Sequence, residues 1–303
     1  MNENEYKTFI DQCLARWSSQ DKRTDDFKEN FITWIAQLPD ESKPLVLKLL
    51  ENFDYYTHTE TNRILRQLHQ KLIDEYLISD ENTIYTFIRS KTGEGNSSID
   101  YWIDYKFINN LNKHICFADT TFITNKQWEM IDNIILVDDC SGTGKTLTDY
   151  VRENALVYKN KRIFYIIIHA MEESLEKIAQ CAAELDVSIV PLYSIARCKA
   201  FINPVLGDDL IVIKTSFVDL SQSLGIPQPH ILGYEESEGL MAFHNNTPNN
   251  TLGLFRWVDK RYKAIFPRTN DPRPEWQRKE TLDKLINDRK RRRAQNYNAQ
   301  KGI

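Results

Sequence analysis

Residues 134–149 read Ile-Ile-Leu-Val-Asp-Asp-Cys-Ser-Gly-Thr-Gly-Lys-Thr-Leu-Thr-Asp, and this stretch decides the fold class. Its first four residues, Ile134–Val137, form an apolar run that predicts a buried parallel strand. Asp138 and Asp139 follow at the carboxyl end of that strand, and Leu147–Asn154 can continue as a helix. This order is typical of α/β proteins, whose ligands bind at the carboxyl ends of the strands.

The loop between the predicted strand and helix consists of small and hydroxyl-bearing residues that suit an anion. Backbone N–H groups of such a loop, with the dipole of the following helix, can hold a phosphate. Paired carboxylates can accept hydrogen bonds from ribose hydroxyls or hold a hydrated Mg²⁺. We therefore predict a sugar-phosphate site with Asp138 and Asp139 as its acidic pair and a phosphate-binding loop of Ser141, Gly142, Thr143, Gly144, Lys145 and Thr146.

Two known kinds of phosphate loop can be compared with this one. A Walker A loop needs a glycine five positions before Gly144-Lys145-Thr146, and Asp139 stands there instead. The apolar run, the two acids and the Thr-Gly-Lys-Thr loop resemble the phosphoribosyl pyrophosphate (PRPP) signature of type I phosphoribosyltransferases. Lys145 departs from that signature, which usually has a small residue there. Without a ligand, the same residues would form an ordinary strand–turn–helix corner with two solvated aspartates.

The overall composition is that of a globular protein, with 303 residues, of which 41% are hydrophobic and 27% charged. A net charge of −4 gives no general nucleic-acid signature. We expect no membrane association, because no apolar run is long enough to span a bilayer and the polar start does not suit a signal peptide. The five scattered cysteines lack metal-ligand spacing, which indicates reduced thiols in a cytoplasmic protein.

The first 79 residues contain no glycine, and their apolar residues recur at helical spacing. Phe9, Cys13 and Trp17 lie four positions apart, and similar stripes follow as far as Tyr76. We therefore predict an N-terminal helical domain over residues 1–79. His58 lies within it and is expected to be a surface or capping residue rather than a ligand.

Beyond residue 79, strand-like and helix-like segments alternate. This alternation predicts an α/β domain over residues 80–270 with an open parallel sheet. The resemblance of residues 134–146 implies that the sheet is of the type I phosphoribosyltransferase kind. The expected strands are 83–88, 114–118, 134–137, 162–169 and 187–192, and the most regular expected helix is 172–185.

A second glycine-bearing loop, residues 89–98, follows the first expected strand. In it Lys91, Gly93 and Gly95 allow the backbone to approach an anion. The loop resembles the pyrophosphate loop of type I enzymes, although a solvent loop would also use glycine for its turns. Residues 118–127 would correspond to the mobile lid of that family, where Lys126 could face pyrophosphate.

Two further segments, Asn246–Thr251 and Phe266-Pro-Arg268, extend the resemblance toward the C-terminus. Together with Asp138–Thr146 they resemble the phosphoribosyltransferase-like proteins of bacterial conflict and anti-phage systems, the PRTase-CE-like group. The resemblance implies a PRPP-type fold that works beside partner proteins, which in some systems are retron reverse transcriptases with their nucleic acid. It implies no particular substrate.

The last part of the chain, residues 271–303, is predicted to be a charged helical tail. Arg289-Lys-Arg-Arg-Arg293 is its dense basic run, and either a solvated helix or a contact with nucleic acid or an acidic partner fits that pattern.

Three functions remain open at this point. The first is a transferase or hydrolase effector of anti-phage defence that binds PRPP or a related ribose-5-phosphate nucleotide with Mg²⁺, in which Asp138 and Asp139 stabilise charge on the ribose. The second is a catalytically inert module that senses a nucleotide and regulates a defence complex. The third is a nucleoside triphosphatase. We expect Mg²⁺ to be held through the ligand and water, and the acceptor base stays open because this fold builds its base pocket differently in each family.

Overall fold

The computed structural model describes residues 3–17, 20–88, 98–207 and 209–268. The predicted pyrophosphate loop, with Lys91, Gly93 and Gly95, and the predicted tail lie outside these residues. The α-helices are α1 (Glu3–Arg16), α2 (Lys22–Ile35), α3 (Lys43–Glu51), α4 (His58–Tyr76), α5 (Ser98–Ile108), α6 (Asn125–Met130), α7 (Lys145–Tyr158), α8 (Glu172–Leu185), α9 (Leu210–Ser223), α10 (Gln228–Ile231) and α11 (Gly253–Arg256). The strands are β1 (Asp54–Tyr56), β2 (Thr83–Thr86), β3 (Asn133–Val137), β4 (Cys140–Ser141), β5 (Arg162–Met171), β6 (Ser188–Arg197) and β7 (Met241–Phe243).

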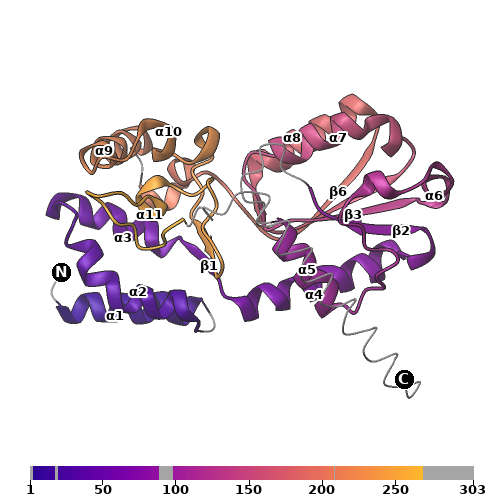
Figure 1. The fold of residues 1–303 in the computed structure, drawn as a ribbon. Helices are drawn as coiled ribbons and strands as arrows, with labels where there is room; N and C mark the ends of the chain where they lie inside the picture. Colours follow the sequence, from indigo (N-terminus) through magenta and orange to yellow (C-terminus); the bar gives the residue numbers. More distant parts are fainter. Residues whose placement is uncertain (1–2, 18–19, 89–97, 208, 269–303) are drawn as a thin grey trace, which may run out of the picture. The chain divides into compact units, whose positions relative to one another are not determined.

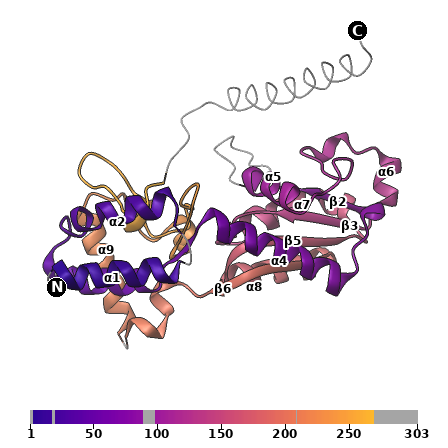
Figure 2. The same ribbon diagram turned by 90° about the horizontal axis from the view of Figure 1, so that it is seen from below.

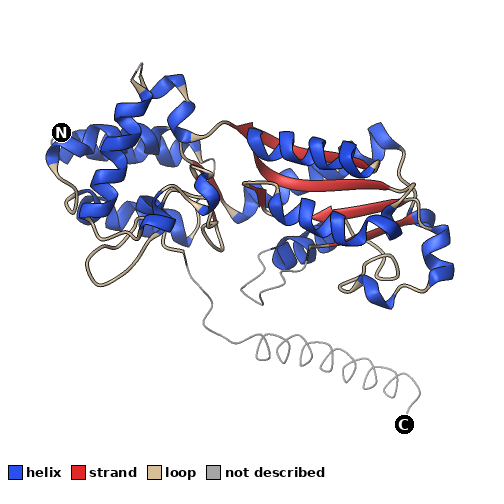
Figure 3. Ribbon diagram, turned by 90° about the horizontal axis from the view of Figure 1, so that it is seen from above, coloured by secondary structure: helices blue, strands red, loops and turns tan. Residues whose placement is uncertain are grey.

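The main sheet is entirely parallel, which confirms the predicted fold class. Strand β2 pairs with β3, β3 pairs with β5, and β5 pairs on its other edge with β6 (Figure 1). The central strands β3 and β5 consist largely of buried apolar and aromatic residues, as expected of a parallel sheet that is covered on both faces, whereas the edge strand β6 is mostly half-buried or exposed. Figure 3 shows the strands gathered side by side, with helices running along them.

Strand β4 continues β3 on the far side of the aspartate pair. Asn133 pairs with Arg162 and Cys140 pairs with His169, so both strands keep one register against β5. The Asp138 N–H donates to the Ile166 carbonyl at 2.9 Å, which carries the pairing through the interruption. The acidic pair therefore lies within an extended run of chain rather than beyond the end of the sheet.

The two faces of the sheet are covered by different helices, because successive side chains of a strand point to opposite faces. Ile135, Val137 and Phe164 pack toward α4 and α5, and α4 lies along β5 and β6 (Figure 2). Ile134 and Leu136 point the other way and pack with apolar residues of α7 and α8. The strand residues thus fix the two layers of helices that surround the sheet.

A separate core joins the N-terminal helices to the C-terminal segments. Its centre is Phe266, which is fully buried and stacks on Phe27, Phe53 and Tyr55 with ring centroids 5.0 to 5.5 Å apart. Arg23 of α2 lies over the same ring, with its guanidinium carbon 5.9 Å from the centroid. Helices α1 to α3 therefore pack on residues that are distant in the sequence.

The hydrophobic cores do not follow the expected division at residue 79. Helix α4 belongs by its contacts to the sheet, whereas residues 200–266 complete the core of α1 to α3. The short parallel sheet of β1 and β7 also pairs an N-terminal with a C-terminal segment. Helical periodicity identifies the apolar face of a helix but not the segment that will cover it.

Most of the expected elements are confirmed, and one is much shorter than expected. Helix α8 has the predicted bounds, and β6 extends five residues beyond its predicted end at 192. The expected strand at 114–118 forms only an isolated parallel bridge between Tyr85 and Cys116. It stops there because Asp119 turns the chain into a short 3-10 helix, accepting a hydrogen bond from the Thr121 N–H.

None of the described helices has the length and apolar character needed to cross a membrane.

We expect Phe266→Ala to lower the free energy of unfolding by about 3–5 kcal/mol, because it removes the ring on which three other aromatic rings stack. Phe122→Ala is the matched control, since that ring is 78% exposed and its loss should change stability by less than about 0.5 kcal/mol. Urea unfolding monitored by circular dichroism measures both. Similar losses in the two variants would contradict this account of the core.

Candidate functional site

The aspartate pair is buried. The exposed fraction is 5% for Asp138 and 8% for Asp139, so the alternative of two solvated aspartates is wrong. No lysine or arginine among the described residues forms an ion pair with either carboxylate. Two adjacent carboxyl groups in such a place are costly unless polar groups or a ligand compensate them.

Neutral donors surround the Asp138 carboxyl group. The Ser98 hydroxyl donates to Oδ1 at 2.6 Å, and the Tyr165 hydroxyl donates to Oδ2 at 3.1 Å. The backbone N–H of Asp139 donates to the same Oδ1 at 2.9 Å, and the N–H of Cys140 donates to Asp139 Oδ1 at 2.7 Å. The carboxyl oxygens are therefore held in fixed positions by α5, by β5 and by the local backbone.

Burial is also the main electrostatic influence on the Asp138 carboxyl group. Burial, and then the neighbouring charge of Asp139, raise the pKa of Asp138 well above that of an ordinary carboxyl group. Burial and the charge of Asp138 raise the pKa of Tyr165, so its hydroxyl stays protonated and remains a donor. The pKa of the Cys140 thiol is raised by burial and by both carboxylates, which keeps the thiol protonated and unsuited to act as a nucleophile.

The loop after the pair leads directly into α7. Gly144 is the residue before the helix and has φ +73°, a conformation that favours glycine; a Cβ there would lie 2.8 Å from the Ser174 carbonyl oxygen. Helix α7 begins at Lys145, and the N–H groups of its first turn have no acceptor within the helix. The described geometry is therefore that of a loop at a helix N-terminus, which suits an anion.

The side chains of the loop differ in accessibility. Ser141 and Thr143 are buried, with exposed fractions of 4% and 8%, whereas Lys145 and Thr146 are exposed. The Lys145 ammonium lies 3.2 Å from Asp149 Oδ2, one helical turn along α7. This contact raises the pKa of Lys145, which carries its positive charge at the rim of the loop.

The C-terminal segment 246–251 touches the phosphate loop. A Cβ at Gly142 would lie 1.9 Å from Nδ2 of Asn250, so a side chain there would have to displace that amide. The Asn250 amide in turn donates to the Ser237 hydroxyl at 3.2 Å. Two stretches that the sequence analysis singled out separately, Gly142 within the loop and Asn250 within Asn246–Thr251, thus form one structure.

The rest of segment 246–251 is tied to distant residues as well as to itself. The Thr247 hydroxyl donates to the Phe266 carbonyl at 2.8 Å, and the Thr251 hydroxyl donates to the Met241 carbonyl at 2.6 Å. Arg268 donates to the Thr247 carbonyl at 2.7 Å. These bonds fix the segment that carries Asn250 against the loop.

Comparison with known proteins now identifies the family. The model of the PRTase-CE family matches residues 31–268, which is most of the chain. This chain belongs to the PRTase-CE family. None of the curated proteins matches it. Among solved structures it is similar to Helicobacter pylori xanthine-guanine-hypoxanthine phosphoribosyltransferase, with 8% sequence identity and a TM-score of 0.31 over 48% of this chain and 88% of that chain.

Membership of the PRTase-CE family confirms the phosphoribosyltransferase-like character that residues 138–146 indicated. The predicted pair Asp138 and Asp139 and the predicted loop residues form one continuous stretch that runs from the end of β3 through β4 into the first turn of α7. In the predicted lid, Lys126 is an exposed residue of α6.

Sequence reasoning missed two donors and one neighbour of the PRTase-CE site. Ser98 and Tyr165 were not predicted as site residues, yet both hydroxyls donate to Asp138. Asn250 was noted only within the segment Asn246–Thr251, and its position beside Gly142 was not predicted. A hydroxyl group in an otherwise apolar strand was the one available signal, because Tyr165 is the only hydroxyl-bearing residue between Ile163 and Ile168.

We expect Asp138→Asn to stabilise the fold by about 1–2 kcal/mol at neutral pH, because the amide removes a buried ionisable group. Since the folded-state pKa is raised, the unfolded chain ionises first as the pH rises, and the wild type loses stability over that range. The gain should vanish near pH 3 and grow toward pH 7. Thermal unfolding across a pH series measures it, and a gain that does not depend on pH would contradict the assignment.

We expect Gly142→Ala to destabilise the chain by about 1–3 kcal/mol, because the new methyl group meets the Asn250 amide. Asn250→Gly removes that obstacle, so the double variant should be more stable than the sum of the single effects predicts. Chemical denaturation of the four proteins gives the coupling energy. Additive effects would show that the loop and the C-terminal segment are not in contact.

Proposed function

We propose that this PRTase-CE protein binds PRPP or a related ribose-5-phosphate nucleotide with Mg²⁺. The observation that carries the proposal is the buried pair Asp138 and Asp139 directly before a loop at a helix N-terminus. The carboxylates would accept hydrogen bonds from the ribose hydroxyls, and the loop amides would bind the 5′-phosphate. Ser141, Thr143 and Thr146 would add hydroxyl donors around that phosphate.

The two carboxyl groups suit Mg²⁺ that is bound through the ligand and water. Carboxylate oxygens suit Mg²⁺, which keeps several of its waters and commonly binds through substrate phosphates. Because the Asp138 oxygens already accept bonds from Ser98, Tyr165 and a backbone N–H, we expect them to contact ribose and metal-bound water rather than the ion itself. Bound Mg²⁺ would neutralise the pyrophosphate charge of PRPP.

In the catalytic form of the proposal, this protein is a transferase or hydrolase effector of an anti-phage defence system. The bond between ribose C1 and the pyrophosphate oxygen breaks, and pyrophosphate leaves with the electron pair. An acceptor base or water then forms the new bond at C1 and gives its proton to the departing pyrophosphate. Asp138 and Asp139 would stabilise the positive charge that develops on the ribose ring. No protein nucleophile is needed, which agrees with the protonated Cys140 thiol.

The alternative is a catalytically inert module that binds the same ligand and regulates a defence complex. The neutral donors around Asp138 favour neither form, because they position ribose equally well with or without turnover. We further propose that the partner is a defence-system protein such as a reverse transcriptase with its nucleic acid. Family membership and the segments Asn246–Thr251 and Phe266–Arg268 support this setting.

We expect PRPP with Mg²⁺ to raise the melting temperature of the full-length protein by roughly 5 °C at saturating ligand. Asp139→Asn should abolish the rise, because it removes a ribose acceptor, and Thr143→Ala should reduce it. Asp186→Asn, at the exposed C-terminal end of α8, is the matched control and should keep the full rise. Scanning fluorimetry with PRPP, ribose 5-phosphate, nucleoside monophosphates and ATP compares the ligands.

Release of pyrophosphate from bound PRPP separates the two forms of the proposal. Binding with release supports the effector, and binding without release supports the regulatory module. An undiminished rise in Asp139→Asn would overturn the site. Lys145-dependent release of phosphate from ATP would instead favour a triphosphatase, which Asp139 at the first Walker glycine position opposes.

A further inference from the structure

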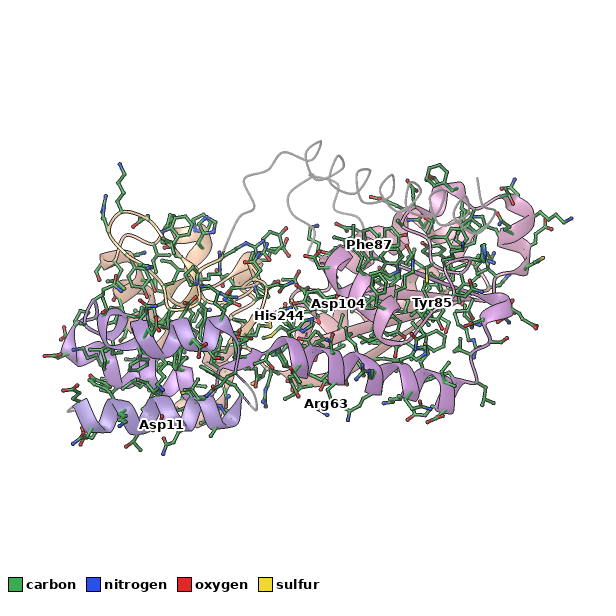
Figure 4. The ribbon with its side chains drawn as sticks, turned by 60° about the horizontal axis from the view of Figure 1, so that its bottom comes forward. Asp11, Arg63, Tyr85, Phe87, Asp104 and His244 are labelled. Carbon is green, nitrogen blue, oxygen red and sulfur yellow. The ribbon has the colours of Figure 1, made fainter. Side chains whose placement is uncertain are left out.

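A second cluster of chemically active side chains lies outside the phosphate loop. His58 is the first residue of α4, Asp104 belongs to α5, and His244 directly follows β7. Each offers one ligand atom, and these atoms all lie within 4.8 Å of one another. Figure 4 labels Asp104 and His244 and shows their side chains close together.

The backbone brings the two histidines together by strand pairing. Strands β1 and β7 are parallel, with Tyr56 opposite Phe243, so their carboxyl ends lie side by side. The His244 N–H donates to the Tyr56 carbonyl at 2.8 Å, and His58 follows two residues after that carbonyl. The rings of His58 and His244 have centroids 4.9 Å apart and planes at 70°.

The side-chain nitrogens and the carboxylate of this cluster are only partly engaged by the protein. His58 Nε2 lies 3.9 Å from Asp104 Oδ2, which is too long for a hydrogen bond, and 3.3 Å from the Asn62 amide. Nδ1 of His244 is buried and has no hydrogen-bond partner among the described residues. A buried imidazole nitrogen without a partner is costly, and a ligand that accepts its lone pair would remove that cost.

We propose that His58, Asp104 and His244 bind a divalent transition-metal ion, with Zn²⁺ as the ion that two imidazoles and one carboxylate suit best. Three protein ligands leave a fourth position for water, as in zinc sites that exchange ligands. Mg²⁺ would not compete, because it prefers an all-oxygen environment. The assignment follows from the chemistry and positions of these three side chains.

Metal binding needs only a small adjustment of the cluster. Zinc–ligand bonds of about 2.0–2.2 Å place tetrahedral donors roughly 3.4 Å apart, so the ligand atoms must approach one another by about an ångström. His58 and Asp104 can make this move, because their side chains are 57% and 34% exposed. The more buried His244 provides the fixed ligand, and His58 would give up its contact with Asn62.

The bound ion would join three segments that are far apart in the sequence. Helix α5 begins at Ser98, the donor to Asp138, and carries Asp104 six residues later. A metal ion at Asp104 would therefore hold the helix that positions part of the proposed ribose site. Bound zinc would stabilise the position of α5, and zinc binding would not require a nucleotide.

The test is calorimetric titration of untagged, chelator-treated full-length protein with ZnCl₂ in a buffer without nucleotide. We expect one Zn²⁺ per chain and a melting temperature raised by roughly 5 °C or more at saturation. His58→Ala, Asp104→Asn and His244→Gln should each weaken binding at least tenfold. His114→Ala removes an exposed histidine elsewhere and should bind zinc as the wild type does.

Substitution by Co²⁺ gives an independent spectroscopic readout, since a His₂Asp site of low coordination number shows visible absorption that surface binding does not. The bands should appear in the wild type and in His114→Ala and be absent from Asp104→Asn. No stoichiometric binding, or binding retained in both His58→Ala and Asp104→Asn, would overturn the proposal. His58 is exposed, so its variant should fold even if His244→Gln does not.

Discussion

The burial of two adjacent carboxyl groups within a central strand is the constraint on which the rest of the site depends. Asp138 and Asp139 interrupt the pairing of β3 with β5, yet the chain resumes the same register as β4. The sheet can hold them there only because hydroxyl groups from α5 and β5 donate to Asp138. The hydroxyl groups of Ser98 and Tyr165 that face the pair serve this one position.

The same constraint explains why the C-terminal segment is built as it is. A loop of small residues cannot hold its own shape by side-chain packing, so the shape must come from neighbours. Asn250 fills the space against Gly142, and Thr247 and Thr251 fix the segment that carries Asn250. That segment is held in turn by Arg23 of α2, which donates to the Thr247 hydroxyl and to the Pro267 carbonyl, both at 2.9 Å. The N-terminal helices thus support the loop through the C-terminal segment.

Sequence patterns predicted the local structure well and the long-range packing poorly. The apolar run before Asp138 and the apolar stripe of α8 can each be recognised from neighbouring residues alone. A buried strand is a short continuous apolar run, whereas an amphipathic helix repeats its apolar residues every three to four positions. The residues that cover α4 and those that pack on α1 to α3 lie from about 100 to more than 200 positions away in the sequence, and local periodicity holds no information about them. The bonds from Ser98 and Tyr165 to Asp138, and the approach of His244 to His58, were unpredictable for the same reason. The phosphate loop could be found because all its parts are consecutive.

Buried carboxyl groups with neutral donors and no described cation partner are a poor way to stabilise a fold. Hydrophobic residues of similar size would pack in β3 at less cost, as Val137 does one position earlier. The pKa of Asp138 records this cost directly, since burial makes the charged form unfavourable in the folded chain. A ligand that brings hydroxyl groups and a hydrated cation would supply what the protein leaves out, and its binding would stabilise the ionised pair. The electrostatic cost at Asp138 and the position of the loop at the N-terminus of α7 therefore agree with the proposed ribose-phosphate ligand, which would lie across both.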